Sequence, residues 1–306
     1  MLDTIRVKYS ISPDPDQLKH WIHKTSISET GIRESYVYNP IIGENKVMLK
    51  YTYYPLGYNN QPLLILELSL PKLIYGNNYT MLLSIPTAIQ AGNKVLAQIP
   101  YAPILDLAEG ILIRFDMCYN HQVGDAVDDY IRAMGNLEYP HRRTKFHRGE
   151  GVEFRAKHIT TKFYNKQKET GLKEAAGILR QETTIQTSKE VQKALKEKKP
   201  TLLHITPDFI NSYLNNDLQK LTLLNNSIAT HATALKILCD AHGGDAGIFY
   251  YGLLCLRTIK SKTSICYESH MHPRSLDRKL LKIIEPGIAL TMTDNKEPLL
   301  PLCVNL

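Results

Sequence analysis

Hydrophobic and polar positions alternate along short segments of the first 200 residues, a pattern typical of β-strands that bury one face. The predicted strands, rich in β-branched, aromatic and aliphatic residues, are 5–9, 46–53, 63–70, 78–84, 110–116, 152–155, 159–164 and 177–182. Helices are predicted at about 125–134 and 189–198. This part of the chain is therefore expected to form a sheet with a few helices.

The pattern changes after the charged segment that ends at Pro200. Apolar residues then recur at helical spacing, and the predicted helices are 207–214, 229–241, 246–259 and 275–284. Ser275 is the expected cap of the last helix, and Pro286-Gly287 follows its end. We predict an α+β fold with a central, largely antiparallel sheet and flanking helices. Residues 1–200 would form the catalytic region and residues 201–306 a mainly helical region that binds DNA.

Two short segments resemble each other. Ala-Glu-Gly-Ile-Leu-Ile-Arg-Phe-Asp (108–116) and Ala-Ala-Gly-Ile-Leu-Arg-Gln-Glu (175–182) both place an arginine two residues before an acid, and an amphipathic helix follows each. The similarity predicts an internal duplication of a strand–helix unit.

Charge is concentrated in one part of the chain. The net charge is +7, and residues 141–200 hold sixteen Lys or Arg against seven Asp or Glu. A polyanionic partner follows from this excess, with nucleic acid favoured over a membrane, although a solvated basic face remains the alternative.

The remaining composition excludes several classes of protein. The five cysteines are widely spaced and form no Cys-x-x-Cys pair, so neither a disulfide framework nor a zinc site is expected, and the compartment should be the reducing cytoplasm. The apolar runs are too short to span a bilayer, and the first residues do not resemble a secretory signal. Walker A, dinucleotide-binding and nucleophile-elbow motifs are absent from the sequence.

Strand alternation groups the residues that could carry chemistry. It places Arg114 with Asp116, Arg180 with Glu182, and Lys162 with Tyr164, while Glu67 stands between two leucines that face the other way. If these faces coincide, Glu67, Asp116 and Glu182 form a carboxylate cluster suited to Mg²⁺ or Mn²⁺. A tyrosine nucleophile needs a nearby cation, metal or base, and Lys162 and Lys166 flank Tyr164. Solvated strand faces and surface ion pairs are the structural alternative.

These residues lie in motifs similar to those of a known family. Leu-Glu-Leu-Ser-Leu-Pro-Lys with a following Gly-Asn (66–77), Ile-Arg-Phe-Asp (113–116), Phe-Tyr-Asn-Lys-Gln-Lys-Glu (163–169), Leu-Arg-Gln-Glu (179–182) and Pro-Arg-Ser-Leu-Asp-Arg with Glu-Pro-Gly-Ile (273–288) occur in that order. The chain resembles the gene II/X-type replication initiators of filamentous phages and, more remotely, the Rep_trans initiators of small staphylococcal plasmids. Each motif is short, and the N-terminal loops and the region after residue 200 match poorly.

The resemblance implies a rolling-circle replication initiator in the cytoplasm of a bacterial host cell. Such proteins nick and rejoin one strand of origin DNA through a 5′-phosphotyrosyl link, and the free 3′-hydroxyl primes synthesis. The family tyrosine corresponds to Tyr164, Lys166 matches a catalytic position, and the acidic metal positions fall on Glu67, Asp116 and Glu182. Glu153 is a less secure further acid. Mg²⁺ or Mn²⁺, double- and single-stranded origin DNA, and host helicase and DNA polymerase are the implied cofactor and partners.

Basic residues around these motifs are the expected DNA contacts. They are Arg114, Arg142, Arg143, Lys145, Arg148, Lys162, Arg180, Arg274, Arg278, Lys279 and Lys282. Three alternatives stay open. The protein could be a non-catalytic DNA-binding regulator or a related transposase or relaxase. It could also use Tyr267 with a metal on His270 and His272, although these histidines are more typical of a loop.

Overall fold

The structure is a computed structural model that describes residues 1–28, 31–42, 45–56, 62–82, 84–147 and 149–306. The chain divides into two compact units, and neither is continuous in sequence: unit 1 comprises Met1–Cys118 and Thr184–Ile210, and unit 2 comprises Tyr119–Thr183 and Asn211–Leu306. These units do not coincide with the predicted regions 1–200 and 201–306, whose separate roles remain predictions.

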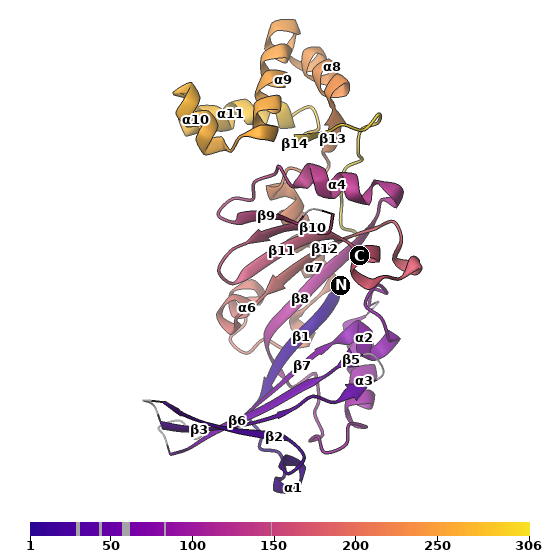
Figure 1. The fold of residues 1–306 in the computed structure, drawn as a ribbon, viewed down its shortest axis with the longest axis vertical. Coiled ribbons are helices and arrows are strands. Elements are labelled where there is room, and N and C mark those ends of the chain that lie inside the picture. Colours follow the sequence, from indigo (N-terminus) through magenta and orange to yellow (C-terminus); the bar gives the residue numbers. More distant parts are fainter. Residues whose placement is uncertain (29–30, 43–44, 57–61, 83, 148) are drawn as a thin grey trace. The chain divides into compact units, whose positions relative to one another are not determined.

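The fold is α+β, as the sequence predicts, with one large, mainly antiparallel sheet and helices that pack on it (Figure 1). The strands are β1 Leu2–Tyr9, β2 Ile22–Ser28, β3 Gly31–Tyr38, β4 Ile41–Ile42, β5 Asn45–Lys46, β6 Met48–Leu56, β7 Leu63–Ser69, β8 Ile111–Gln122, β9 Arg143–His147, β10 Gly151–Arg155, β11 Ile159–Asn165, β12 Ile178–Ile185, β13 Ser227–Thr230 and β14 Ile288–Thr293. The α-helices are α1 Pro15–Leu18, α2 Leu70–Tyr75, α3 Ile85–Leu96, α4 Val127–Met134, α5 Lys166–Thr170, α6 Ser188–Leu195, α7 Pro207–Lys220, α8 His231–His242, α9 Gly244–Ile259, α10 Lys262–Ser269 and α11 Pro273–Ile284. Short 3₁₀ turns cover Gly124–Ala126, Lys173–Ala175 and Leu202–His204.

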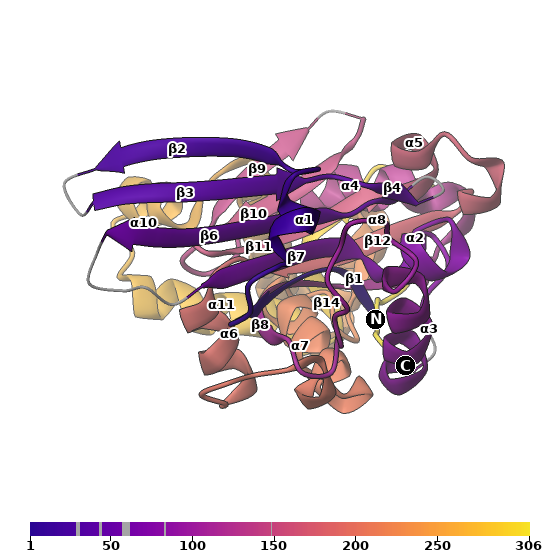
Figure 2. The ribbon, with the colours of Figure 1, turned by 90° about the horizontal axis from the view of Figure 1, so that it is seen from below.

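Unit 1 is built on strands in the order β2-β3-β6-β7-β1-β8, and its recorded pairings are all antiparallel (Figure 2). Burial alternates along β1 and β7, as expected for strands with one covered face. The covered face carries Val7, Leu64, Leu66 and Leu68, and the side chains of α2 and α3 complete the apolar core there. The opposite face, which we call the open face of unit 1, carries the polar side chains of both strands.

The outer strands β2, β3 and β6 extend beyond the helices (Figures 1 and 2). Aromatic rings stabilise this extension on the face that continues the core: the His23 ring stacks on Tyr36 at 4.5 Å between centroids, and Tyr36 contacts Tyr51 and Tyr53. Such cross-strand aromatic pairs are typical stabilising contacts of a sheet. These contacts join β2, β3 and β6 on that face.

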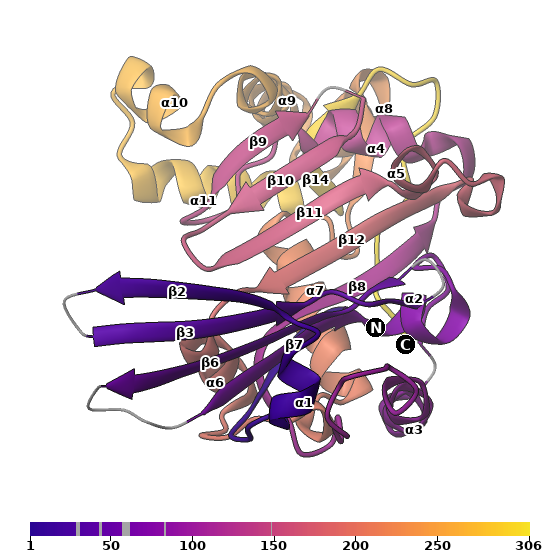
Figure 3. The same cartoon turned by 60° about the horizontal axis from the view of Figure 1, so that its bottom comes forward.

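Unit 2 contains the strands β12-β11-β10-β9 and the last residues of β8 (Figure 3). α7 covers one face of β11 and β12, where the buried Asp217 accepts hydrogen bonds from Thr161 (2.9 Å), Thr183 (2.7 Å) and Tyr139 (2.6 Å). A carboxylate that is fully buried needs such partners because its desolvation is costly. The opposite face of β11 and β12 carries Tyr164 and Glu182.

The C-terminal helices of unit 2 enclose a second apolar core. Residues of α8, α9, α10, α11 and β14 contribute to it, including Leu238, Leu254, Ile265 and Ile283. Arg257 of α9, which is 4% exposed, forms an ion pair with Glu138 at 3.1 Å. Within the described ranges, no helix combines the length and the apolar character that a bilayer span needs.

The strand order contains a topological repeat. The spatial series β1-β7-β6-β3-β2 and β8-β12-β11-β10-β9 are connected in the same way. In each, the second strand in the chain lies at the edge of the sheet. The following strands then add inward one by one until the last pairs with the first. The predicted duplication therefore appears in the topology, but not between the segments that suggested it. Residues 110–116 and 177–182 belong to β8 and β12, which are the first and last strands of one repeat.

Most predicted elements are present, with a few differences. The predicted strand 78–84 is wrong, because residues 77–80 form bends and Ser84 caps α3. The last helix starts before Ser275: His272 is its cap, and Pro273 occupies the first helical position, where its missing N–H costs nothing. Elements that the sequence did not predict include the hairpin β2–β3, the strands β9, β13 and β14, and the helices α1, α2, α3, α5 and α10. Of these, α3 was missed although its apolar residues recur at helical spacing.

Candidate active site

Tyr164 lies near the end of β11, on the face of unit 2 opposite α7. Thr161 and Phe163 are buried, whereas Lys162 and Tyr164 are only half-buried. Gly151 of β10 lies directly opposite Tyr164 in the register. A Cβ at Gly151 would lie 2.5 Å from the Phe163 carbonyl oxygen and 2.8 Å from the Tyr164 Cβ, so only glycine fits beside the tyrosine.

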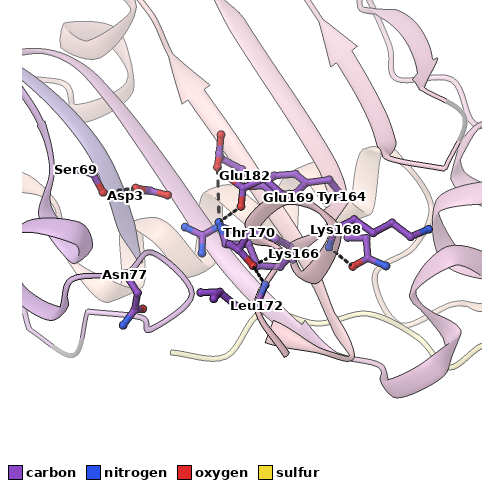
Figure 4. A network of polar contacts seen from close by, with 12 residues as sticks. Asp3, Ser69, Asn77, Tyr164, Lys166, Lys168, Glu169, Thr170, Leu172 and Glu182 are labelled. Atoms are coloured by element: carbon purple, nitrogen blue, oxygen red, sulfur yellow. Dashed lines mark hydrogen bonds and ion pairs between the residues drawn. The ribbon is translucent and has the colours of Figure 1, made fainter. Parts of the chain in front are cut away.

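The Tyr164 hydroxyl donates a hydrogen bond to the Glu182 Oε2 atom on the neighbouring strand β12 at 2.9 Å (Figure 4). Glu182 also lies 3.9 Å from the guanidinium of Arg180, which is 1% exposed and donates to Asn120 at 3.3 Å. A phenol, a carboxylate and a buried cation therefore lie along β11 and β12. The pairing of a phenol with a carboxylate that can take its proton is the arrangement expected of an activated nucleophile.

Lys166 follows at the first position of α5, and its side chain is fully buried. Its ammonium lies 2.7 Å from Glu169 and 5.6 Å from the centre of the Tyr164 ring (Figure 4). Lys166 lies beside Tyr164 as the sequence predicts, and Glu169 compensates its charge. Its catalytic role stays a prediction. The pair nevertheless keeps a cation within reach of the ring face.

Asn165 joins the strand of the tyrosine to its helix. Its side chain caps α5 by accepting from the Lys168 backbone N–H (3.2 Å), and it donates to Asp128 of α4 at 3.0 Å. The Lys168 ammonium binds the same Asp128 at 2.7 Å, and this hydrogen bond lowers the pKa of the Asp128 carboxyl. These contacts hold the turn after Tyr164 against α4.

In unit 1, two of the predicted acids lie among arginines on the open face. The guanidinium of Arg6 binds Glu67 through Nε at 2.5 Å and through a second nitrogen. Arg114 donates to Glu67 at 3.1 Å and to Asp116 at 3.0 Å. Arg114 and Asp116 thus share a face as predicted, while a register shift in β8 leaves Ile113 partly exposed rather than buried with Phe115.

Each of the three predicted metal ligands has a polar partner within its own unit. Glu67 and Asp116 are neutralised by two guanidinium groups, and Glu182, in unit 2, accepts from Tyr164. No group of three or more His, Cys, Asp or Glu side chains among the described residues is arranged to hold a metal ion. Binding of Mg²⁺ would require exchange of these ion pairs, so the metal remains a prediction.

The predicted DNA contacts differ in accessibility. Arg143 and Lys145 of β9 are exposed, and Lys162 is half-buried. Arg142 is buried against the Tyr139 ring and donates to Thr161 at 2.6 Å. Arg142 and Arg180 would need a rearrangement to reach a phosphate, because both serve inside unit 2. Arg148 lies outside the described residues.

On α11, Arg274 and Arg278 are exposed, but two other cations are engaged. Lys279 lies over the Phe249 ring at 4.5 Å, and Lys282 pairs with Glu285 at 2.8 Å. His272 accepts from the Arg274 backbone N–H as the cap of α11, and His270 ends α10. Both histidines therefore lie in the connection between α10 and α11, where the sequence predicts a loop.

Sequence reasoning missed four residues that shape the candidate site: Arg6, Asn120, Gly151 and Asn165. Arg6 lies in Thr-Ile-Arg-Val, which echoes the Leu-Ile-Arg-Phe around Arg114, and Asn165 stands before a helix as caps do. These signals were available in the sequence. Gly151 and Asn120 had none, because their roles depend on partners in other strands.

Comparison with known proteins adds one similarity. No protein-family model matches the chain, and no curated protein matches its sequence. A solved structure described as a rolling circle replication initiator protein from Geobacillus stearothermophilus is similar over 72% of this chain and 84% of that one, with 10% sequence identity and a TM-score of 0.35. At that TM-score the similarity carries no argument about the fold or the activity of this chain.

Proposed function

We propose that this protein is a rolling-circle replication initiator that nicks and rejoins one strand of origin DNA, with Tyr164 as the nucleophile. The observation that carries the proposal is the 2.9 Å hydrogen bond from the Tyr164 hydroxyl to Glu182. A tyrosine at its ordinary pKa is a poor nucleophile, and a carboxylate that accepts its proton removes this obstacle.

The step follows from this pair. The Tyr164 oxygen attacks the phosphorus of the scissile phosphodiester, the phenolic proton passes to Glu182, and the bond from phosphorus to the 3′-oxygen breaks. The 3′-oxygen takes a proton from solvent and becomes the primer end, while a 5′-phosphotyrosyl bond holds the other end. Rejoining reverses these transfers, and Glu182 then returns the proton to the tyrosine.

Two features of unit 2 support this assignment. Arg180 is buried 3.9 Å from Glu182, so the carboxylate has a nearby positive charge. The Lys166–Glu169 pair and the cap at Asn165 hold the turn after the tyrosine. The sequence motifs and the positive charge of the chain favour DNA as the substrate.

The wider assignments belong to the same proposal. Mg²⁺ or Mn²⁺ is the proposed cofactor, origin DNA would be the substrate, and host helicase and polymerase would act after the nick in the bacterial cytoplasm. None of these partners follows from the Tyr164–Glu182 geometry itself, so each needs its own assay.

Nicking of supercoiled replicon DNA tests the proposal. Wild-type protein with Mg²⁺ or Mn²⁺ should give nicked circles and a covalent protein–DNA band on denaturing gels, and EDTA should abolish both. Tyr164→Phe should lose the nick and the band, whereas Tyr267→Phe, which changes a residue of α10 that is 83% exposed, should keep them. Nicking that persists in Tyr164→Phe and disappears in Tyr267→Phe would move the nucleophile. Binding without any cut would favour the regulator.

A further inference from the structure

A row of cations crosses the open face of unit 1, outside every group assigned above. In the strand register, Lys50 of β6 lies opposite Ile65 of β7, and Ile65 lies opposite Lys8 of β1. All three alternate with buried residues and therefore point to the same side as Glu67 and Arg6.

The same face continues onto the extension formed by β2 and β3. Val37 of β3 lies opposite Lys50, so Ser35 and Arg33 share its side by alternation. Lys24 of β2 lies opposite Ser35. Because neighbouring strands are about 4.8 Å apart, cations recur roughly every 10 Å from β2 through β6 to β1.

These cations lack an acidic partner among the described residues, unlike several lysines elsewhere in the chain. Lys168, Lys260, Lys262 and Lys282 all form ion pairs. In contrast, no described acid pairs with Lys8, Lys24, Arg33 or Lys50, and the Nε of Arg33 is buried without a hydrogen-bond partner among the described residues.

The nearest acid of the extension, Glu34, points to the opposite face. It accepts from Thr25 at 2.8 Å and contacts His23 at 2.5 Å, and the Thr25 hydrogen bond, followed by that of His23, lowers the pKa of its carboxyl. The open face of the extension therefore carries positive charge that nothing described on it neutralises.

Apolar side chains lie between the cations. Ile22, opposite Val37, is 61% exposed, and Ile65 is half-buried between Lys50 and Lys8. A duplex presents mainly phosphates to a flat surface, whereas an unpaired strand offers both phosphates and the faces of its bases. Alternating cations and apolar side chains fit the unpaired strand.

We propose that Lys8, Lys24, Arg33 and Lys50 form a binding surface for the phosphate backbone of single-stranded DNA. The inference rests on the proposed function, because a protein that cuts one strand must hold that strand after it leaves the duplex. It adds a surface on β2, β3 and β6 that neither the nicking chemistry nor the basic segment 141–200 requires.

The test measures binding without cleavage. A fluorescent oligonucleotide of about 20 nucleotides is titrated with full-length Tyr164→Phe protein at several salt concentrations, with and without Lys24→Gln, Arg33→Gln and Lys50→Gln together. Each lost phosphate contact removes about 0.7 from the slope of log K against log salt, so the slope should fall by about 2. Affinity at about 50 mM salt should fall at least tenfold.

The matched control replaces three lysines of unit 1 outside this face, Lys46, Lys72 and Lys94, by glutamine, and affinity should then change less than about twofold. Circular dichroism and thermal melting check that each variant is folded. If the triple variant does not fold, the affinities of the single variants Lys24→Gln and Lys50→Gln test the proposal instead. Equal affinity and slope for variant and parent would overturn the proposal. The proposal would also be overturned if a duplex of the same sequence bound the parent protein as tightly and lost as much affinity in the triple variant.

Nicking is measured separately to keep the two proposals apart. The nicking rate of the wild type at saturating protein tests the chemistry, whereas the affinity of the triple variant tests the binding surface. If wild type never cuts but the triple variant still loses affinity for single-stranded DNA, the nicking function fails and the binding surface stands.

Discussion

Gly151→Ala tests whether the position of Tyr164 depends on its cross-strand neighbour. The added Cβ would lie 2.5 Å from the Phe163 carbonyl oxygen and 2.8 Å from the Tyr164 Cβ. Ordinary contact begins near 3.4 Å, so β10 and β11 must separate locally by nearly an ångström. Neither contact involves the flexible end of a side chain, so the backbone has to move.

Two effects follow from that movement. Overpacking of a well-ordered region costs roughly 1–3 kcal/mol of unfolding free energy. Displacement of a nucleophile by about 1 Å costs on the order of 10²-fold in rate, because the attacking oxygen leaves its aligned position. The variant should therefore stay folded while its nicking rate falls by about two orders of magnitude.

The assay combines urea unfolding with single-turnover nicking at saturating protein. Gly252→Ala is the control, because the Cβ at Gly252 meets nothing within 4 Å in the middle of α9. That change should stabilise the protein slightly, by up to about 1 kcal/mol, since alanine favours a helix more than glycine does. A Gly151→Ala protein with wild-type stability and wild-type nicking would refute this account of the strand register.

Three further predictions concern polar groups of unit 2. Glu182→Gln should slow nicking by about 10²- to 10⁴-fold with little change in DNA affinity, because the Tyr164 proton loses its acceptor, and an unchanged single-turnover rate would exclude that role. Asp217→Asn should lower the free energy of unfolding by about 3–5 kcal/mol, because it leaves the buried Arg142 uncompensated, and an unshifted urea midpoint would contradict this. Burial lowers the pKa of His121 to about 4, so the unfolded chain binds the proton first as pH falls below about 6.5. Stability should therefore decrease by roughly 3 kcal/mol between pH 6.5 and 4, and His121→Leu should remove this part of the pH dependence.

The sequence alone was sufficient for features that depend on local periodicity. Side chains alternate along a strand with a period of two, so Tyr164 could be separated from Phe163, and Arg114 grouped with Asp116, without knowledge of any partner strand. The same reasoning identified β11 and β12 as strands of an α+β protein.

Local pattern was less reliable where other forces compete. The segment 78–84 has strand-like composition but lies between two helices, and Ser84 caps the second of them. Ser275 is a good cap residue, yet His272 has that role because Pro273 can start the helix one turn earlier.

Tertiary structure alone decided which of these groups meet. The bond from Tyr164 to Glu182, the space left by Gly151 and the burial of Arg142 all depend on strand order and register. Those are set by contacts between residues far apart in the chain, and alternation within one strand carries no information about them. The acids that the sequence grouped as metal ligands illustrate the difference: alternation assigned Glu67 to a face, but only the pairing of β1 with β7 placed Arg6 beside it.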